Sequence, residues 1–427
     1  MGTPGKGAAP NHGAGRGDTA GPGMAGAPGE GAADGPGTPV GAGPVSGRWA
    51  EWARSRNAKT LARSRWRRLS ALDGSTLRGR TAEGKSVVVF ASNDYLGLSL
   101  HPRVVAAAKE AAARWGTGAG AARLMTGTRP VHSELEAALA AWKGEERALV
   151  YPSGYAANIG VLSALGGPGV LICSDALNHA SIVDGCRLAG AVGATVRVYP
   201  HRRTAAVEEA LAGWPGRAVV VSDSVFSMDG DTAAVRELAD LCAATGALLV
   251  LDEAHAVLGP LVQDLPCELL RTGTLSKALG SQGGFAAGPA EMVDLLVNRS
   301  RSFIFTTALA PASAAAALEA LRLVRSPEGG LLLEALMGHA RRLWPGRAEP
   351  TPILPVPCGT EDAALRAAAE LLERGFAVPA VRPPTVAPGT SRLRVTVSSG
   401  HTPAEVAALA AALEEIGLAP GSYEAGT

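Results

Sequence analysis

The amino-acid sequence predicts an α/β protein with a mainly parallel sheet, followed by a smaller α+β domain. Three continuous apolar runs end in polar residues, GVLICSD (169–175), AVVVSDS (218–224) and ALLVLDE (247–253), and such runs indicate strands buried on both faces. The helical pattern AAVRELADLCAATG lies between the last two runs, which is the alternation of a parallel sheet. RLRVTV (392–397) alternates instead, which is typical of a half-buried strand in the smaller domain.

The N-terminal part divides into two segments. Residues 1–45 are almost entirely Gly, Ala and Pro, so they bury too little apolar surface to offset their ordering entropy, and we predict a disordered tail. The tail has no apolar segment typical of a signal peptide. The basic and aromatic stretch from Trp49 to Arg68 has helical character, and VVVF (87–90) is a short strand pattern. We therefore expect a helical arm with short strands over 46–97.

Capping signals place the next elements. SELEAALAAWKG predicts a helix that starts with a capping box of Ser133 and Glu136. ALVY (148–151) followed by PSGYAAN indicates a strand, a turn and a helix. TPAEVAALAAALEEIG predicts a last helix with Thr402 as its cap and Glu405 completing a capping box. The elements suggest a large domain over 98–300 and a small domain over 301–427.

Composition narrows the function. The chain has 427 residues, 47% of them hydrophobic, and a formal net charge of +1, so neither nucleic acid nor an anionic membrane is expected as a partner. Small-molecule substrates are expected instead, and the apolar runs are too short to span a bilayer. Five scattered cysteines without a C-x-x-C pair indicate neither a disulfide scaffold nor a metal site and fit a reducing cytoplasm.

Lys277 is the first candidate for a reactive group. It lies in RTGTLSKALGSQGG (271–284), where it is isolated from other cations. LDEAH places Asp252 at a strand end and His255 three residues later, with Lys277 22 residues after His255. Taken alone, Asp252 could be a helix cap and His255 a core histidine. Together the three suit a site for pyridoxal 5'-phosphate (PLP), because the lysine amine can form a Schiff base and the carboxylate can keep the pyridine nitrogen protonated.

A phosphate group needs amide and hydroxyl donors, and the sequence offers several. Ser153 and Gly154 lie at a predicted strand-to-helix junction, where the helix dipole favours an anion, although many such turns only cap a helix. Thr274 and FTTA (305–308) add hydroxyls. His179 in NHAS could stack on an aromatic ring or be an ordinary loop histidine.

Competing motifs fit less well. The sequence has no G-x-S-x-G elbow, no G-x-x-x-x-G-K-[ST] loop and no H-E-x-x-H. GAGAARLMTG is a loose dinucleotide fingerprint, but it follows a helical segment rather than a strand.

Taken in order, the motifs resemble those of the α-oxoamine synthases. The motifs are SNDYLGLSLHP, GTGAGAARLMTGTRPVHSELE, YPSGYAAN, DALNHASIVDG, SDSVFSMDGD, LDEAH, TLSKALGSQGG and RPPTVAPGTSRLRVTVS, and they cover about residues 50–420. This resemblance implies a fold-type I, aspartate-aminotransferase-like PLP enzyme with a seven-stranded sheet, active as a homodimer, that condenses an amino acid with an acyl-CoA and loses CO2. FSMDGD and RPPTVAPGTSRLR look most like the members that use L-alanine and a pimeloyl thioester in biotin biosynthesis.

The resemblance also implies cofactor roles. Lys277 would hold PLP covalently and act as base, Asp252 would pair with the pyridine N–H, His255 would bond the ring hydroxyl and His179 would stack on the ring. The phosphate region would be held by Gly154 and Tyr155, with Ser227 and Thr274 nearby, and Thr307 would reach the phosphate of the neighbouring subunit.

The implied substrate residues are Arg394, Thr385 and Arg67, with Arg394 as the clamp for the amino-acid carboxylate. Two departures from the family stand out. Ala122 and Ala256 replace a usual Ser and Gly, and the segment 256–273 is shorter than usual. The altered loop leaves open another α-oxoamine synthase with a different amino acid or thioester. A non-catalytic partner subunit is a third alternative, which the presence of Lys277, Asp252 and His179 disfavours.

Overall fold

The structure, a computed structural model, describes residues 47–63, 65–257 and 262–421. Contacts divide the chain into two units, Met1–Lys59 and Thr60–Thr427. The predicted tail over 1–45 lies outside the described residues. In the first unit, α1 (Arg48–Ala62) begins, and the rings of Trp49 and Trp52 meet edge to face at 5.8 Å.

The predicted helix over 49–68 is too long at its C-terminal end. The helix α1 ends at Ala62, and residues 65–71 are not helical. Arg65 lies in this segment, and its guanidinium pairs with Glu361 at 2.9 Å. This long-range ion pair competes with continuation of a helix that carries several adjacent arginines.

The second unit contains a seven-stranded sheet. Its strands are β4 (Arg147–Tyr151), β5 (Leu171–Asp175), β6 (Thr195–Tyr199), β7 (Ala218–Asp223), β8 (Leu248–Asp252), β9 (Leu269–Thr274) and β10 (Gly284–Gly288). Their order is β4-β10-β9-β8-β7-β5-β6. The pairs from β6 through β9 are parallel, and β10 runs antiparallel to both of its neighbours. The predicted mainly parallel sheet is confirmed.

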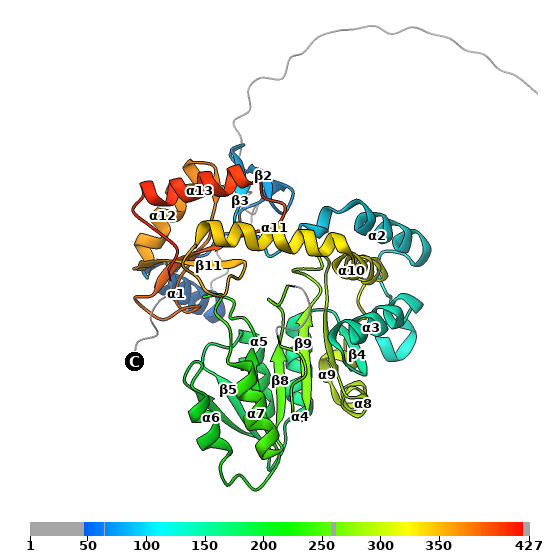
Figure 1. Cartoon of the computed structure of the whole chain (residues 1–427). Helices are drawn as coiled ribbons and strands as arrows, with labels where there is room; N and C mark the ends of the chain where they lie inside the picture. The colour runs from blue at the N-terminus through cyan, green and yellow to red at the C-terminus, as the bar shows by residue number, and fades with distance from the viewer. Residues whose placement is uncertain (1–46, 64, 258–261, 422–427) are drawn as a thin grey trace, which may run out of the picture. The chain divides into compact units, whose positions relative to one another are not determined.

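Helices cover both faces of this sheet (Figure 1). One face carries α4 (Gly154–Leu165), α5 (Ala180–Ala191), α8 (Ala290–Arg299) and α9 (Arg301–Ile304), and the other carries α6 (Thr204–Leu211) and α7 (Val235–Thr245). In β7, Val219 and Val221 pack under the first group while Val220 packs under the second. Because both faces are buried, the strands appear in the sequence as continuous apolar runs.

Another helical layer lies beside β4 and β10. It contains η1 (Leu98–Leu100), α2 (Pro102–Trp115), η2 (Arg123–Gly127), α3 (Pro130–Lys143), α10 (Pro311–Val324) and α11 (Pro327–Leu343). The helix α10 packs against α2 and α3. The predicted capping box of Ser133 and Glu136 is wrong, because α3 begins earlier, at Pro130, a residue favoured at the first helical position. Glu136 binds Arg123 at 2.8 Å instead.

Two small sheets complete the second unit. One has the order β1-β2-β3-β12, with β1 (Leu72–Gly74), β2 (Arg78–Thr81), β3 (Ser86–Val89) and β12 (Phe376–Ala377). The other has the order β11-β14-β13, with β11 (Ile353–Gly359), β13 (Ala380–Val381) and β14 (Ser391–Thr396), and it lies against α12 (Glu361–Glu373). The parallel pair of β3 and β12 joins segments far apart in the sequence. The predicted domain boundaries stay a prediction.

The strand β14 is not half-buried as predicted. All six of its residues are buried, because it is the central strand of its sheet. Its charged side chains are tolerated there because they have partners. Arg392 pairs with Asp229, and Arg394 donates to the carbonyl of Ser227.

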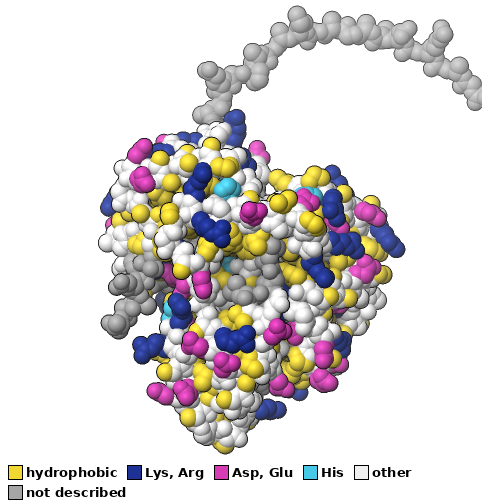
Figure 2. All heavy atoms as spheres, in the orientation of Figure 1, with side chains coloured by type: hydrophobic (Ala, Val, Ile, Leu, Met, Phe, Trp, Pro, Cys, Tyr) yellow, Lys and Arg dark blue, Asp and Glu magenta, His cyan; other side chains and the backbone are white. Residues whose placement is uncertain are grey.

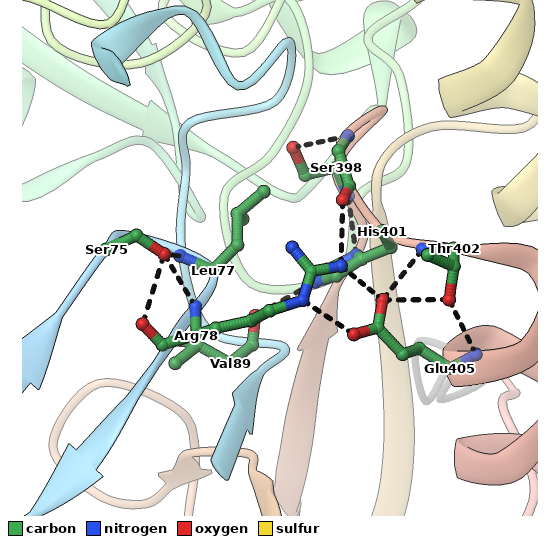
Figure 3. Close-up of polar contacts among 9 residues, drawn as sticks. Ser75, Leu77, Arg78, Val89, Ser398, His401, Thr402 and Glu405 are labelled. Carbon is green, nitrogen blue, oxygen red and sulfur yellow. Dashed lines mark hydrogen bonds and ion pairs between the residues drawn. The ribbon is translucent and has the colours of Figure 1, made fainter. Parts of the chain in front are cut away.

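The last helix, α13 (Pro403–Glu415), begins with the predicted capping box (Figure 3). The backbone N–H of Glu405 donates to Thr402 Oγ1 at 3.2 Å, and the N–H of Thr402 donates to Glu405 Oε2 at 2.7 Å. Arg78 of β2 donates to both carboxylate oxygens of Glu405, at 2.7 and 2.5 Å. The helix cap is therefore also the anchor of the N-terminal strands.

Candidate active site

Three parallel strands of the large sheet end in buried aspartates, Asp175 on β5, Asp223 on β7 and Asp252 on β8. Asp223 and Asp252 are direct neighbours in the strand register. The pKa of Asp223 is raised well above its usual range, first because the group is buried and second because Asp252 repels its charged form. The carboxyl ends of the strands, where ligands bind in such sheets, thus hold two adjacent carboxyl groups.

The Asp252 carboxylate is fixed from two sides. Asn158 Nδ2 donates to Oδ2 at 2.6 Å, and the backbone N–H of Ala254 donates to Oδ1 at 2.8 Å. The amide of Asn158 also accepts from Thr272 Oγ1 at 2.6 Å and donates to Ser181 at 2.8 Å. Sequence reasoning missed Asn158, although a lone polar residue inside an apolar helix near the Ser153 cap is a signal for such a role.

Lys277 lies at the end of a hydrogen-bonded chain. Its Nζ is 3.0 Å from His255 Nε2, and His255 Nδ1 is 2.5 Å from the hydroxyl of Tyr95. The Tyr95 hydroxyl donates to Asn93 Oδ1 at 3.1 Å. The Tyr95 hydroxyl donates its proton to Asn93, so it can only accept from His255. We therefore assign the single N–H of the neutral His255 ring to Nδ1, which leaves Nε2 as the acceptor from Lys277.

Burial controls the protonation of this chain. It lowers the pKa of His255 well below its usual range, and the charges of Lys277 and Arg394 act in the same direction. Burial also lowers the pKa of Lys277 to about 8, against the opposing effect of Asp252. The imidazole is therefore neutral near pH 7, and the lysine amine loses its proton far more readily than an exposed lysine.

The far end of the chain is Arg394 on β14. Its Nη1 and Nη2 each lie 3.2 Å from Asn93 Oδ1, its Nε donates to the Ser227 carbonyl at 2.5 Å, and Nη1 also donates to Thr396 at 2.9 Å. Asn93 thus links the lysine end to the guanidinium end. Sequence reasoning also missed Asn93 and Tyr95, which lie in the SNDYLG motif before the large sheet begins.

His179 caps the start of α5 beside the two aspartates. Its backbone N–H donates to Asp223 Oδ2 at 2.9 Å, and its Nδ1 lies 2.7 Å from Ser181 Oγ. Its ring meets the ring of Tyr155 edge to face at 6.4 Å. These contacts hold the imidazole by its backbone and one nitrogen, so that a ring face can receive an aromatic group.

The start of α4 forms a cradle for an anion. Ser153 caps this helix, and a Cβ on Gly154 would lie 3.2 Å from the Cβ of Thr274, so the helix terminus and β9 approach closely. A Cβ on Gly284 would lie 2.4 Å from the backbone nitrogen of Gly154, so only glycine fits there. The Thr274 and Ser276 hydroxyls are 2.7 Å apart. Amides, hydroxyls and the helix dipole therefore meet at one place.

Several predicted site residues are not part of this cluster. The Tyr155 hydroxyl bonds Asp184, and Ser227 contributes its carbonyl rather than its side chain. Thr307, Thr385 and Arg67 are exposed, and within the described ranges none of them bonds a member of the Lys277–Arg394 chain. Their predicted roles stay predictions.

Charged side chains of both signs are mixed on one face of the molecule. Figure 2 shows Lys and Arg side chains interspersed with Asp and Glu over the face in view, in line with the formal net charge of +1. In the described part of the chain, no three His, Cys, Asp or Glu side chains are grouped to hold a metal ion. No described helix is both long and apolar enough to cross a bilayer.

Comparison with known proteins relates this geometry to a family. Residues 85–413 match the model of the aminotransferase class I and II family. The 8-amino-7-oxononanoate synthase of Anaeromyxobacter dehalogenans strain 2CP-1 is 50% identical over 357 residues, covering 78% of this chain and 88% of the relative. A serine palmitoyltransferase from S. paucimobilis with a bound PLP–myriocin aldimine is 28% identical, with a TM-score of 0.78 and coverage of 86% of this chain and 98% of that chain.

A solved 8-amino-7-oxononanoate synthase of Francisella tularensis shares the fold, at 24% identity, a TM-score of 0.63 and coverage of 78% of this chain and 98% of that one. The matched range includes the sheet, the lysine and the strand-end carboxylates. These matches confirm the predicted fold type, PLP dependence and acyltransferase class. The chain therefore belongs to the 8-amino-7-oxononanoate synthase family, PLP-dependent acyltransferases of biotin biosynthesis with the aminotransferase class I and II fold.

Proposed function

We propose that the chain condenses L-alanine with a pimeloyl thioester to give 8-amino-7-oxononanoate, CO2 and a free thiol. The observation that carries this proposal is the hydrogen-bonded chain from the Lys277 amine to the Arg394 guanidinium. The reaction needs an amine that can move a proton and a cation that can hold the amino-acid carboxylate. The hydrogen bonds between these side chains connect the amine of Lys277 to the guanidinium of Arg394. The product named for the relatives supplies the choice of substrates.

The described residues fit each polar group of PLP. The N-terminus of α4, at Gly154 and Tyr155, and the hydroxyl of Thr274 suit the phosphate. Asp252 suits the protonated pyridine nitrogen, since its carboxylate is buried and fixed by two donors. We assign the ring face to His179.

The reactive groups of PLP fit the remaining residues. Lys277 suits covalent attachment of the aldehyde, because its pKa is lowered to about 8 and a useful share of the amine is neutral near pH 7. His255 Nε2, the nitrogen that faces Lys277, suits the ring hydroxyl. Bound PLP supplies an electron sink for negative charge at the amino-acid Cα.

We assign the movement of the Cα proton to Lys277. Its neighbour His255 is neutral, so the imidazole adds no competing positive charge beside the lysine amine. The Tyr95 hydroxyl, at 2.5 Å, fixes the tautomer of this ring from the other side. The lysine therefore has a neutral imidazole of fixed orientation beside it when it gives up or takes a proton.

We assign the substrate carboxylate to Arg394. The guanidinium is held in one orientation by Ser227 and Asn93, which limits the conformational entropy lost when the substrate binds. A planar fork with several N–H donors suits a carboxylate better than a point charge does. Arg67 and Thr385, both exposed, are proposed to contact the substrates.

We propose a homodimer in which Thr307 reaches the phosphate of the partner subunit. Large apolar side chains are exposed beside it, with Met125 at 78% and Phe305 at 70% exposure, which suits a covered interface. The backbone N–H of Ala308 bonds the carbonyl of Ala121 at 3.0 Å, so the two segments form one surface.

The five cysteines suit a reducing cytoplasm as the location.

A thiol-release assay tests the reaction. Purified holoenzyme is given L-alanine, glycine or L-serine with pimeloyl-, acetyl-, succinyl- or palmitoyl-CoA, and pimeloyl carrier protein is compared with pimeloyl-CoA. The highest kcat/KM is expected for L-alanine with a pimeloyl thioester. Much faster turnover of glycine with acetyl- or succinyl-CoA, or of serine with palmitoyl-CoA, would refute the substrate assignment.

A further inference from the structure

The loop over residues 226–231, FSMDGD, lies between the large sheet and the sheet of β14. Its Ser227 carbonyl accepts from Arg394 Nε at 2.5 Å, and its Asp229 pairs with Arg392. Thr351 Oγ1 donates to the Gly230 carbonyl at 2.8 Å. Gly230 has a φ of 67°, and a Cβ there would lie 2.3 Å from the Ile353 carbonyl oxygen, so the loop has no room on this side.

On its other side the loop is held by one histidine. His201 Nε2 lies 2.9 Å from Asp231 Oδ2, and His201 Nδ1 lies 2.9 Å from Asp175 Oδ1. Asp175 is the strand-end aspartate of β5, so His201 ties the loop to the large sheet. The ring also meets Phe226 edge to face at 4.4 Å, which fixes its plane.

The geometry requires a protonated ring. Both imidazole nitrogens face carboxylate oxygens, which only accept hydrogen bonds, so both nitrogens must donate. A neutral ring would place a lone pair against one of the carboxylates. In agreement, the bonds and charges of Asp175 and Asp231 outweigh the opposing effect of burial and raise the pKa of His201 to about 9.

The charged groups around this clamp, His201 with Asp175 and Asp231, have both signs. Asp223 interacts with the charge of Asp175, and Glu349 interacts with that of Arg347. The basic groups contact the clamp carboxylates. The backbone N–H of Arg202 donates to Asp175 Oδ2 at 2.9 Å, and its guanidinium lies 3.6 Å from Asp231. Arg347, from the other side of the loop, interacts with the charge of Asp231. The buried phenol of Tyr199 lies near Asp175. These contacts place an N–H donor and positive charge against the two aspartates that face His201.

We propose that His201 is a positioning residue for substrate binding. As an imidazolium between Asp175 and Asp231, it fixes the 226–231 loop so that the Ser227 carbonyl holds Arg394 in the orientation that receives the amino-acid carboxylate. This inference rests on the proposed role of Arg394. The pH dependence follows from the raised pKa of His201 in the folded protein. His201 is protonated at pH 7, so the clamp is complete there, and the clamp is lost as the pH rises through about 9.

The test compares steady-state kinetics of the holoenzymes of wild type, His201→Gln and Asp231→Asn. Loss of one charge-assisted hydrogen bond is expected to raise KM for the amino acid about tenfold, with kcat and KM for the thioester changed less than about twofold. His101→Gln is the matched control, because this histidine faces Glu328 at 3.2 Å on another part of the chain. This control is expected to leave all three constants unchanged.

The pH profile separates positioning from a merely structural effect. The ratio of amino-acid KM in His201→Gln to that in wild type is expected to fall toward 1 between pH 8 and 10, because wild type then loses its own clamp. Taking this ratio cancels the titration of Lys277 and of the substrate amine. Proton NMR of the histidine Cε1 positions in wild-type holoenzyme, with His201→Gln for assignment, gives the titration midpoint directly.

Arg394→Lys separates this inference from the proposed function. If Arg394→Lys leaves KM for the amino acid unchanged, the carboxylate role of Arg394 is wrong. If Arg394→Lys raises it while His201→Gln and Asp231→Asn do not, or if the His201 signal titrates below pH 7, the positioning role is wrong. Should His201→Gln not fold, Asp231→Asn and the wild-type NMR titration decide.

Discussion

The side chain of Asn93 links the lysine end and the guanidinium end of the hydrogen-bonded chain. Its single Oδ1 accepts from Tyr95 at 3.1 Å and from both Nη atoms of Arg394 at 3.2 Å. Asn93→Ala removes this acceptor from three donors at once. We expect the variant to bind the amino acid less well and to hold the His255 tautomer less firmly.

The size of the effect follows from the contacts. Hydrogen bonds to charged groups contribute about 1.5–3 kcal/mol, but the two from Arg394 share one acceptor and are long, so the pair is taken as about 1.5 kcal/mol. The neutral bond from Tyr95 adds about 0.5 kcal/mol. The sum of about 2 kcal/mol corresponds to about a 30-fold loss in kcat/KM for the amino acid.

The assay is thiol release at saturating thioester with the amino acid varied. Asn93→Asp is a second variant, which keeps the acceptor for Arg394 but places a negative charge beside the incoming carboxylate. KM for the amino acid is therefore expected to rise, while the stability of the protein is expected to stay the same. Asn298→Ala, at an exposed asparagine that bonds the Asp294 carbonyl, is the control and is expected to change nothing. A loss below about threefold in Asn93→Ala would show that the chain does not couple its two ends.

Three further predictions concern the site and its support. Loading of apoprotein with PLP is expected to quicken as the pH rises and to level off above about 8, because the pKa of Lys277 is lowered to about 8, and a midpoint near 10 by visible absorbance would contradict this. Lys143→Met removes the cation 2.8 Å from the buried Glu253, while Arg271 keeps its own contact with that carboxylate. Chemical denaturation is therefore expected to show a loss of about 1–3 kcal/mol, whereas no measurable loss would exclude a net role for this pair. Gly230→Ala meets the Ile353 carbonyl at 2.3 Å and is expected to lower thermal stability and raise KM for the amino acid; unchanged values of both would show that the loop has room.

The parts of the fold that depend on local sequence were predictable. Strands buried on two faces must be apolar at every position, so β5, β7 and β8 appear as uninterrupted runs, and their polar ends mark the edge where a ligand binds. The cap of α13 was predictable for the same reason, since Thr402 and Glu405 satisfy each other within one turn.

Other features depend on contacts between distant segments, which spacing cannot reveal. Asn158 bonds Asp252 across 94 positions of the chain, and Asn93 bonds Arg394 across 301. In the sequence, the arginines of β14 indicate the exposed polar face of an alternating strand. In the structure they are buried, because Asp229 and the Ser227 carbonyl lie beside them. In α3, Ser133 and Glu136 satisfied the local rule for a cap, but the proline at 130 allowed an earlier start.

In the proposed reaction, binding of the amino acid at Arg394 also changes the basicity of Lys277, the residue assigned to deprotonate it. The charge of Arg394 lowers the pKa of both Lys277 and His255. A carboxylate bound against Arg394 offsets that charge, so it removes part of this lowering and makes the lysine amine a stronger base when the amino acid is in place. Before the amino acid binds, the unopposed guanidinium favours the neutral lysine that PLP attachment requires. Arg394 is therefore proposed to act at both stages, and the 226–231 loop that contacts it is proposed to affect both.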